Sequence, residues 1–83
     1  MAYIIAKKNI KNEKVTVLTV NDVFVPIDED KKHVCKGFTD INEANKVKEK
    51  YDKEYPHDVI AVGIYQQGLV DPGQVFKDYF EKK

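Results

Sequence analysis

Short apolar segments alternate with polar ones along the first half of the chain. Residues 3–7 are β-prone, and residues 15–20 are rich in β-branched side chains, which fit a pleated, half-buried sheet. The polar residues 9–14 between them are typical of a turn. Residues 23–27 form a third apolar segment, and residues 33–36 suit a short fourth strand. The pattern therefore predicts three or four strands in this region.

Only an Asn-Asp dipeptide, residues 21–22, separates the second strand from the third. Both residue types tolerate positive φ, so we expect a two-residue hairpin turn. In that register Leu18 lies opposite Val25, and Phe24 points to the other face of the sheet. Pro26 cannot donate a hydrogen bond to a neighbouring strand, so the third strand is expected at an edge.

The middle of the chain changes to a helical period. Apolar residues recur there at intervals of three and four, which marks one helix face; they are Ile41, Ala44, Val47, Tyr51 and Tyr55. Asp40 is a suitable N-cap, with Glu43 at the capping-box position. Pro56 disfavours a helical residue before it, so the helix is predicted to end near Glu54.

Residues 58–65 are almost continuously apolar and too few for a helix. Such a run is typical of a central strand that is buried on both faces. Asp71 and Pro72 then suit the N-cap and first residue of a second helix. The apolar stripe of that helix consists of Val75, Phe76, Tyr79 and Phe80.

The order of elements predicts one α+β domain over residues 1–83. We expect a mainly antiparallel sheet of four to five strands with two helices, in the order β-β-β-(β)-α-β-α. The residues expected to be largely buried are Ile41, Val47, Tyr51, Val59, Ile60, Val62 and Ile64.

The composition narrows the classes of function. The chain of 83 residues has 14 lysines, no arginine, 14 acidic residues and zero net charge. Its longest apolar run, residues 59–65, is far shorter than the roughly 20 residues of a membrane-spanning helix. We expect no signal peptide and no membrane partner. A lone Cys35 cannot form an internal disulfide, which fits a reducing cytoplasm.

Arginine and serine are both absent, whereas Lys, Asn and Ile are frequent. This bias is what the codon usage of an A/T-rich genome produces. With the small size and the lack of catalytic motifs, it leads to the hypothesis of a phage or mobile-element accessory protein from a low-GC source.

No motif predicts catalysis or a cofactor. Without serine the common hydroxyl nucleophile is missing, and there is no phosphate-binding or dinucleotide-binding glycine loop. The soft metal ligands are His33, Cys35 and His57, with Asp58 beside the last, and they lack the paired spacing of zinc sites. We therefore expect no enzyme, no cofactor and no metal, and a metal-stabilised domain built on these ligands is a third alternative.

The aromatic residues favour a protein partner or self-association. The chain has five tyrosines and four phenylalanines, and aromatic side chains are enriched at the centres of interfaces. If helices cover one face of the sheet, Phe24 is left on the open face beside Pro26, and Tyr65 is a further candidate. The leading hypothesis is therefore a small non-catalytic module that binds a protein or a second copy through Phe24, Pro26 and Tyr65.

Four lysines around the first turn support an alternative function. Lys7, Lys8, Lys11 and Lys14 could gather at one hairpin tip and contact phosphates. Without arginine, bidentate recognition of guanine is not available. The alternative is therefore weak, sequence-independent binding of nucleic acid through the hairpin of residues 7–14.

Overall fold

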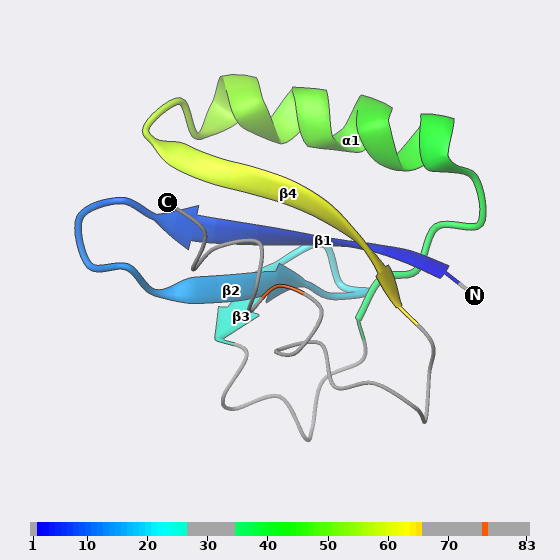
Figure 1. Ribbon diagram of the computed structural model, residues 1–83, viewed down its shortest axis with the longest axis horizontal. Coiled ribbons are helices and arrows are strands. Elements are labelled where there is room, and N and C mark those ends of the chain that lie inside the picture. Colours follow the sequence, from blue (N-terminus) through cyan, green and yellow to red (C-terminus); the bar gives the residue numbers. More distant parts are fainter. Residues whose placement is uncertain (1, 27–34, 66–75, 77–83) are drawn as a thin grey trace.

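The computed structural model describes residues 2–26, 35–65 and 76. Their elements are β1 (Ala2–Asn9), β2 (Val15–Leu18), β3 (Phe24–Pro26), α1 (Ile41–Glu54) and β4 (Asp58–Tyr65). The strands form one antiparallel sheet in the order β3-β2-β1-β4 (Figure 1). The predicted α+β class is confirmed. The second predicted helix lies outside the described residues except for Phe76, which is in helical conformation.

β1 is one of the two central strands of the sheet, with β2 the other, and β4 lies at an edge of the part of the sheet that the structure describes. Residues Ile4, Ile5 and Ala6 of β1 are fully buried, whereas Val59 and Ile64 of β4 are 39% and 55% exposed. Within the sheet that the structure describes, the prediction that residues 58–65 form the central strand is therefore wrong. A continuous apolar run indicates that both faces of a strand are covered, but it carries no information about whether both of its edges are paired.

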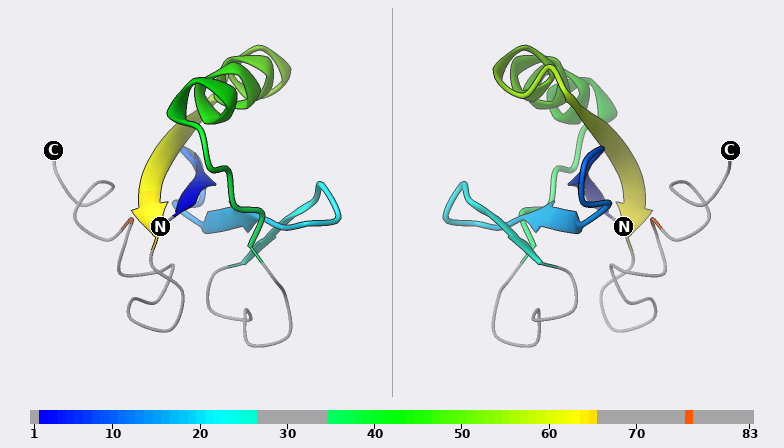
Figure 2. Two further views of the ribbon diagram at one scale, coloured as in Figure 1. Left: turned by 90° about the vertical axis from the view of Figure 1, so that its right-hand side faces the viewer. Right: turned by 90° about the vertical axis from the view of Figure 1, so that its left-hand side faces the viewer.

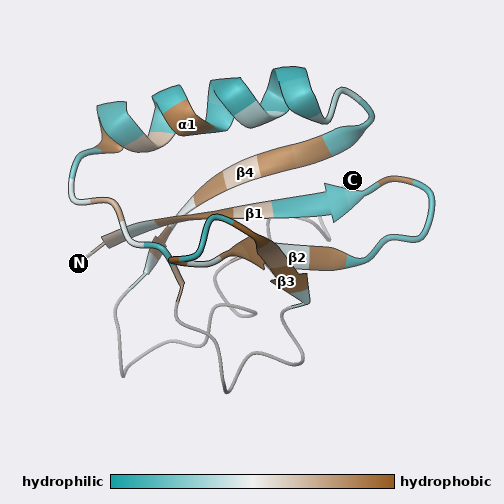
Figure 3. Cartoon of the chain, turned by 180° about the vertical axis from the view of Figure 1, so that it is seen from behind, coloured by the Kyte–Doolittle hydropathy of each residue, from teal (hydrophilic) through white to brown (hydrophobic). Residues whose placement is uncertain are grey.

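Helix α1 begins and ends where the sequence predicts. The Asp40 side chain caps it, since Oδ1 accepts a hydrogen bond from the backbone N–H of Asn42 at 2.9 Å. The helix ends at Glu54, before Pro56. Its outward side is mainly hydrophilic, whereas the strand beneath it is mainly hydrophobic (Figure 3). The helix therefore covers the sheet with one amphipathic face.

The sheet has a buried cluster on each face, because successive side chains of β1 alternate between the faces. The cluster under α1 consists of Ile5, Leu18, Phe38, Ala44, Tyr51 and Ile60. The opposite cluster consists of Ile4, Ala6, Val17, Ala61 and Phe76. Phe76, from the predicted apolar stripe, is 2% exposed and therefore belongs to the core. The face that was expected to stay open is thus covered by at least this side chain.

The expected core is only partly buried. Tyr51 and Ile60 are buried as predicted, and Val47 and Val62 are half-buried. Ile41 is 39% exposed and joins Val59 and Ile64 outside the core. These three residues lie at or near the ends of α1 and β4.

The β2–β3 hairpin has a different register from the predicted one. Leu18 pairs with Phe24, and Val17 pairs with Val25. The loop is one residue longer than expected, because Thr19 and not Val20 closes it: the Thr19 N–H donates to the Val23 carbonyl at 3.0 Å. A one-residue shift moves every side chain of a strand to the other face. Phe24 therefore shares the helix-covered face with Leu18.

Residues 35–38 lie between the separating ends of β1 and β2. Cys35 forms a single bridge with Thr19, and Phe38 forms one with Tyr3. Of the fourth strand predicted at residues 33–36, the described part is thus a bridge and not a full strand. Figure 2 shows this segment passing from the hairpin side to the start of α1. The path of this segment brings Lys36 beside Asp22 at the tip of the hairpin.

Candidate functional site

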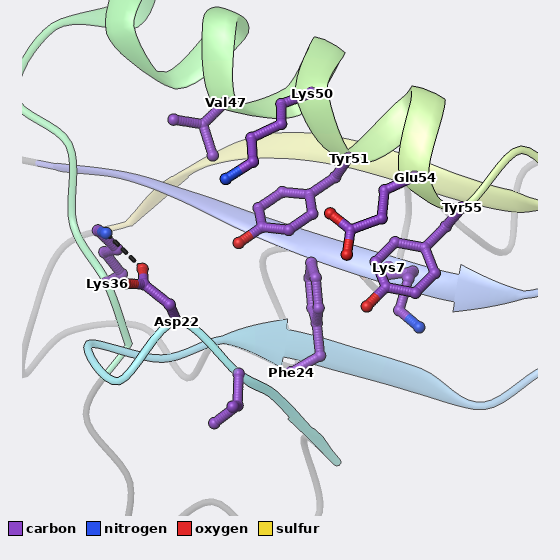
Figure 4. Close-up of a pocket in the computed structure, with 10 residues that line it drawn as sticks. Lys7, Asp22, Phe24, Lys36, Val47, Lys50, Tyr51, Glu54 and Tyr55 are labelled. Carbon is purple, nitrogen blue, oxygen red and sulfur yellow. Dashed lines mark hydrogen bonds and ion pairs between the residues drawn. The ribbon is translucent and has the colours of Figure 1, made fainter.

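A groove lies between the C-terminal half of α1 and the β2–β3 hairpin (Figure 4). Its cavity volume is about 660 Å³, and it is open to solvent along one side. The residues that line it come from β1, the hairpin, the segment before α1 and α1 itself. They are Lys7, Asp22, Val23, Phe24, Lys36, Val47, Lys50, Tyr51, Glu54 and Tyr55.

Three aromatic rings form the floor of this groove. The Phe24 and Tyr51 ring centroids are 5.1 Å apart at an interplanar angle of 76°, and those of Phe24 and Tyr55 are 6.0 Å apart at 89°. Edge-to-face geometry of this kind is favourable because a ring's positive edge meets another ring's negative face. Tyr51 and Tyr55 are stacked one helical turn apart at 6.2 Å. The rings therefore hold one another in place before any ligand arrives.

The Lys7 side chain closes one end of the aromatic floor. Its ammonium nitrogen lies 4.2 Å from the Tyr55 ring centroid and 5.2 Å from that of Phe24. The same nitrogen forms an ion pair with Asp58 at 3.4 Å, and the two side chains are only 17% and 12% exposed. Alternation along β1 explains this placement, since Lys7 lies two residues after the buried Ile5 and therefore on the same face.

The other end of the groove is formed by Asp22 and Lys36, which make an ion pair at 2.5 Å. The hydrogen bond from Lys36 and its positive charge lower the pKa of the Asp22 carboxyl. The hydrogen bond to Asp22 likewise raises the pKa of the Lys36 ammonium. Asp22 has a φ of 63°, a conformation that Asp and Asn adopt more readily than most residues. The turn thus aims its carboxylate at the segment before α1.

Two charged residues of α1 border the groove without an ion-pair partner among the described residues. Lys50 lies 5.6 Å from the Tyr51 ring centroid, and Glu54 follows one helical turn later. Burial raises the pKa of the Tyr51 phenol, and the negative charges of Asp22 and Glu54 raise it further. This hydroxyl therefore stays protonated at neutral pH. Besides its two ion pairs, the groove therefore offers the Lys50 ammonium, the Glu54 carboxylate and the Tyr51 hydroxyl around an aromatic floor.

The three residues predicted to bind a partner are not brought together. Phe24 lies on the groove floor and faces α1, which corrects its assignment to an open face. Pro26 is exposed at the end of β3, the other edge of the sheet, as predicted. Tyr65 packs against the cluster on the opposite face of the sheet. Only Phe24 of the three belongs to the groove.

The lysines predicted to bind nucleic acid are also divided. Lys7 is withdrawn into the groove, whereas Lys8 follows it in β1 and points to the opposite face. Lys11 and Lys14 are exposed in the turn, where Asn9 and Asn12 side chains accept hydrogen bonds from their backbone N–H groups. Lys7 is therefore not available to a surface formed by the other three.

The ligands considered for zinc gain no support from the described residues. Among these residues no group of three or more His, Cys, Asp or Glu side chains could hold a metal ion. His33 lies outside the described part of the chain. Cys35 is half-buried beside the cluster on the face opposite α1. Asp58, the fourth residue considered, pairs with Lys7.

Several groove residues were not singled out from the sequence. Val47, Tyr51 and Tyr55 form a visible helical stripe, and Lys50 and Glu54 border it at the same spacing, so the helix side of the groove could have been predicted. Nothing in the sequence pairs Asp22 with Lys36, because their contact depends on the longer hairpin loop.

No family model, no curated protein and no solved structure matches this chain. In the described part of the chain, no helix has both the length and the apolar character needed to cross a membrane.

Proposed function

We propose that the protein is a small non-catalytic binding module that recognises a segment of another protein in the groove between α1 and the β2–β3 hairpin. The observation that carries this proposal is the aromatic floor of Phe24, Tyr51 and Tyr55, preassembled in a groove that is open to solvent. Aromatic side chains that are already held in place bind a partner with little further loss of conformational entropy.

The charges around the groove indicate the chemistry of the partner. Lys50 and Glu54 are one helical turn apart and have no ion-pair partner among the described residues. A segment that presents a carboxylate near Lys50, a basic side chain near Glu54 and an apolar side chain between them complements this arrangement. Zero net charge on the chain fits a partner chosen by local contacts and not by long-range attraction.

A charge swap on α1 tests the proposal. The tagged 83-residue chain is used to capture proteins from cells of its source, and each candidate is then purified and titrated by calorimetry. The test variant is Lys50→Glu with Glu54→Lys, and the matched control is Glu49→Lys with Lys53→Glu on the outward side of the same helix. Both variants keep the net charge and the four-residue spacing.

We expect the groove swap to weaken binding by about tenfold or more, and the control swap to leave it unchanged. Equal binding by both variants, or no protein that binds the purified wild type, would contradict the proposal.

The alternative function, weak nucleic-acid binding, is now tied to Lys8, Lys11 and Lys14. Three lysines allow a slope of at most about −2.7 for the logarithm of the affinity against the logarithm of the salt concentration on duplex DNA. Micromolar duplex binding with such a slope, unaffected by the groove swap, would make this alternative the better account. We further propose a cytoplasmic location and a phage or mobile-element origin, which rest on the lone cysteine and the A/T-type composition.

A further inference from the structure

The two edges of the described sheet differ in how they are protected. β3 has three residues and ends at Pro26, which has no N–H to offer a new strand. β4 has eight residues in unbroken register with β1, and residues 59–65 contain no charge and no proline. Soluble proteins usually protect an edge strand with lysine, proline, a bulge or short length. β4 has none of these.

The direction of the backbone groups in β4 follows from the hydrogen bonds of β1. Tyr3 and Phe38 exchange both of their backbone hydrogen bonds at 2.8 Å, so the Tyr3 N–H and C=O point away from β4. Ile64 is the β4 partner of Tyr3, and Val62 is the partner of Ile5, two residues later in β1. By the alternation of an antiparallel ladder, Val62 and Ile64 turn their N–H and C=O outward. Neither residue has a backbone partner on that side in the part of the chain that the structure describes.

The exposure of β4 limits which part of this edge is accessible. Ile60 also turns its backbone outward, but it is 3% exposed beneath α1. Val62 is half-buried, and Ile64 is 55% exposed. The accessible edge is therefore the second half of β4, and an apolar side chain marks its most exposed point.

We propose that this half of β4 pairs antiparallel with the same strand of a second copy, with the two-fold axis passing between the two Gly63 residues. An antiparallel pair of identical strands is self-complementary, as a closed dimer requires. In this register Val62 and Ile64 of one copy are opposite Ile64 and Val62 of the other, and both pairs are of the hydrogen-bonded type. The outward N–H and C=O groups of Val62 and Ile64 in both copies are thereby satisfied, and the two sheets become continuous.

The side chains and charges agree with this register. Val62 and Ile64 share the face covered by α1, so their cross-strand pairs are apolar. On the other face Ala61 lies opposite Tyr65 of the second copy. Gly63 has no side chain at the axis, where the backbones approach most closely. The chain has zero net charge, so two copies do not repel one another. This surface is separate from the groove, and the two proposals can fail independently.

Sedimentation equilibrium of the full chain, from about 10 μM to about 1 mM, tests the dimer, since a small interface gives a weak association. We expect the mass to rise from 9.6 kDa toward twice that value. Ile64→Lys places a charge at the edge and is expected to keep the protein monomeric with an unchanged Tm. The matched control is Ile10→Lys, an isoleucine 60% exposed in the first turn, which should dimerise like the wild type.

Amide hydrogen exchange distinguishes this dimer from any other. The Val62 and Ile64 amides should gain protection as concentration rises, and Ile64→Lys should remove the gain at Val62. A monomer throughout the range, a dimer of the Ile64→Lys variant, or a dimer in which these two amides stay unprotected would each overturn the proposal.

Discussion

The ammonium of Lys7 lies over the face of the Tyr55 ring, 4.2 Å from its centroid. Lys7 is a residue of the central strand, and Tyr55 is the C-cap of α1, so this contact joins the end of the helix to the sheet. The ion pair with Asp58 secures the same ammonium from the first residue of β4. One lysine thus fixes three elements around the end of the groove.

Replacing this lysine should destabilise the fold more than replacing an exposed one. Lys7→Met keeps an unbranched side chain but removes the charge from a site that is 17% exposed, and it leaves Asp58 without its partner. We expect a loss of about 1–2 kcal/mol in the free energy of unfolding, measured by urea titration. Lys11→Met in the exposed turn is the control and should change the free energy of unfolding by less than about 0.5 kcal/mol. Equal effects of the two substitutions would show that the Lys7 contacts contribute nothing.

The ion pair between Asp22 and Lys36 predicts a defined pH dependence. Because Lys36 lowers the pKa of Asp22, the carboxylate stabilises the folded state above its ordinary pKa near 3.8, and this contribution is lost as pH falls through the lower value in the folded state. Asp22→Asn retains a residue that tolerates positive φ but removes the charge. Its Tm should lie below that of the wild type at pH 6, and the difference should vanish near pH 2.

Two measurements check this pH prediction. The difference in Tm between the wild type and Asp22→Asn at pH 6 should shrink in high salt, because the Asp22 and Lys36 side chains are exposed to solvent. Glu13→Gln, at an exposed turn residue with no ion pair to a described residue, should show no comparable change between pH 6 and pH 2. A Tm difference for Asp22→Asn that stays constant over the same range would contradict the prediction.

The corrected strand order predicts where truncation is costly. Ile5 is fully buried in the central strand, so Ile5→Ala leaves a cavity and should cost about 2–5 kcal/mol of unfolding free energy. Val59→Ala removes two methyl carbons from a residue that is 39% exposed in β4 and should cost less than about 1 kcal/mol. Chemical denaturation of both variants measures these values. A larger loss at Val59 than at Ile5 would support the central position of residues 58–65 that the sequence alone predicted.

The amino-acid sequence by itself determined the local elements of this protein. The three- and four-residue spacing from Ala44 to Tyr51, the cap at Asp40 and the stop before Pro56 are local features, and α1 follows them. β-branched and apolar runs likewise predicted the strands, and Pro26 correctly indicated an edge. These predictions succeed because they depend on neighbouring residues of the same segment.

Only the tertiary structure decided which strand is central, which face Phe24 occupies and which charges meet. The hydrophobic pattern of a strand records what covers its faces, so it could not tell that, within the described sheet, β1 is paired on both edges and β4 on one. A single added residue in the hairpin loop turned Phe24 toward Tyr51 and brought Asp22 to Lys36. Long-range pairing and loop length determine these relationships, and neither is encoded in the periodicity of any one segment.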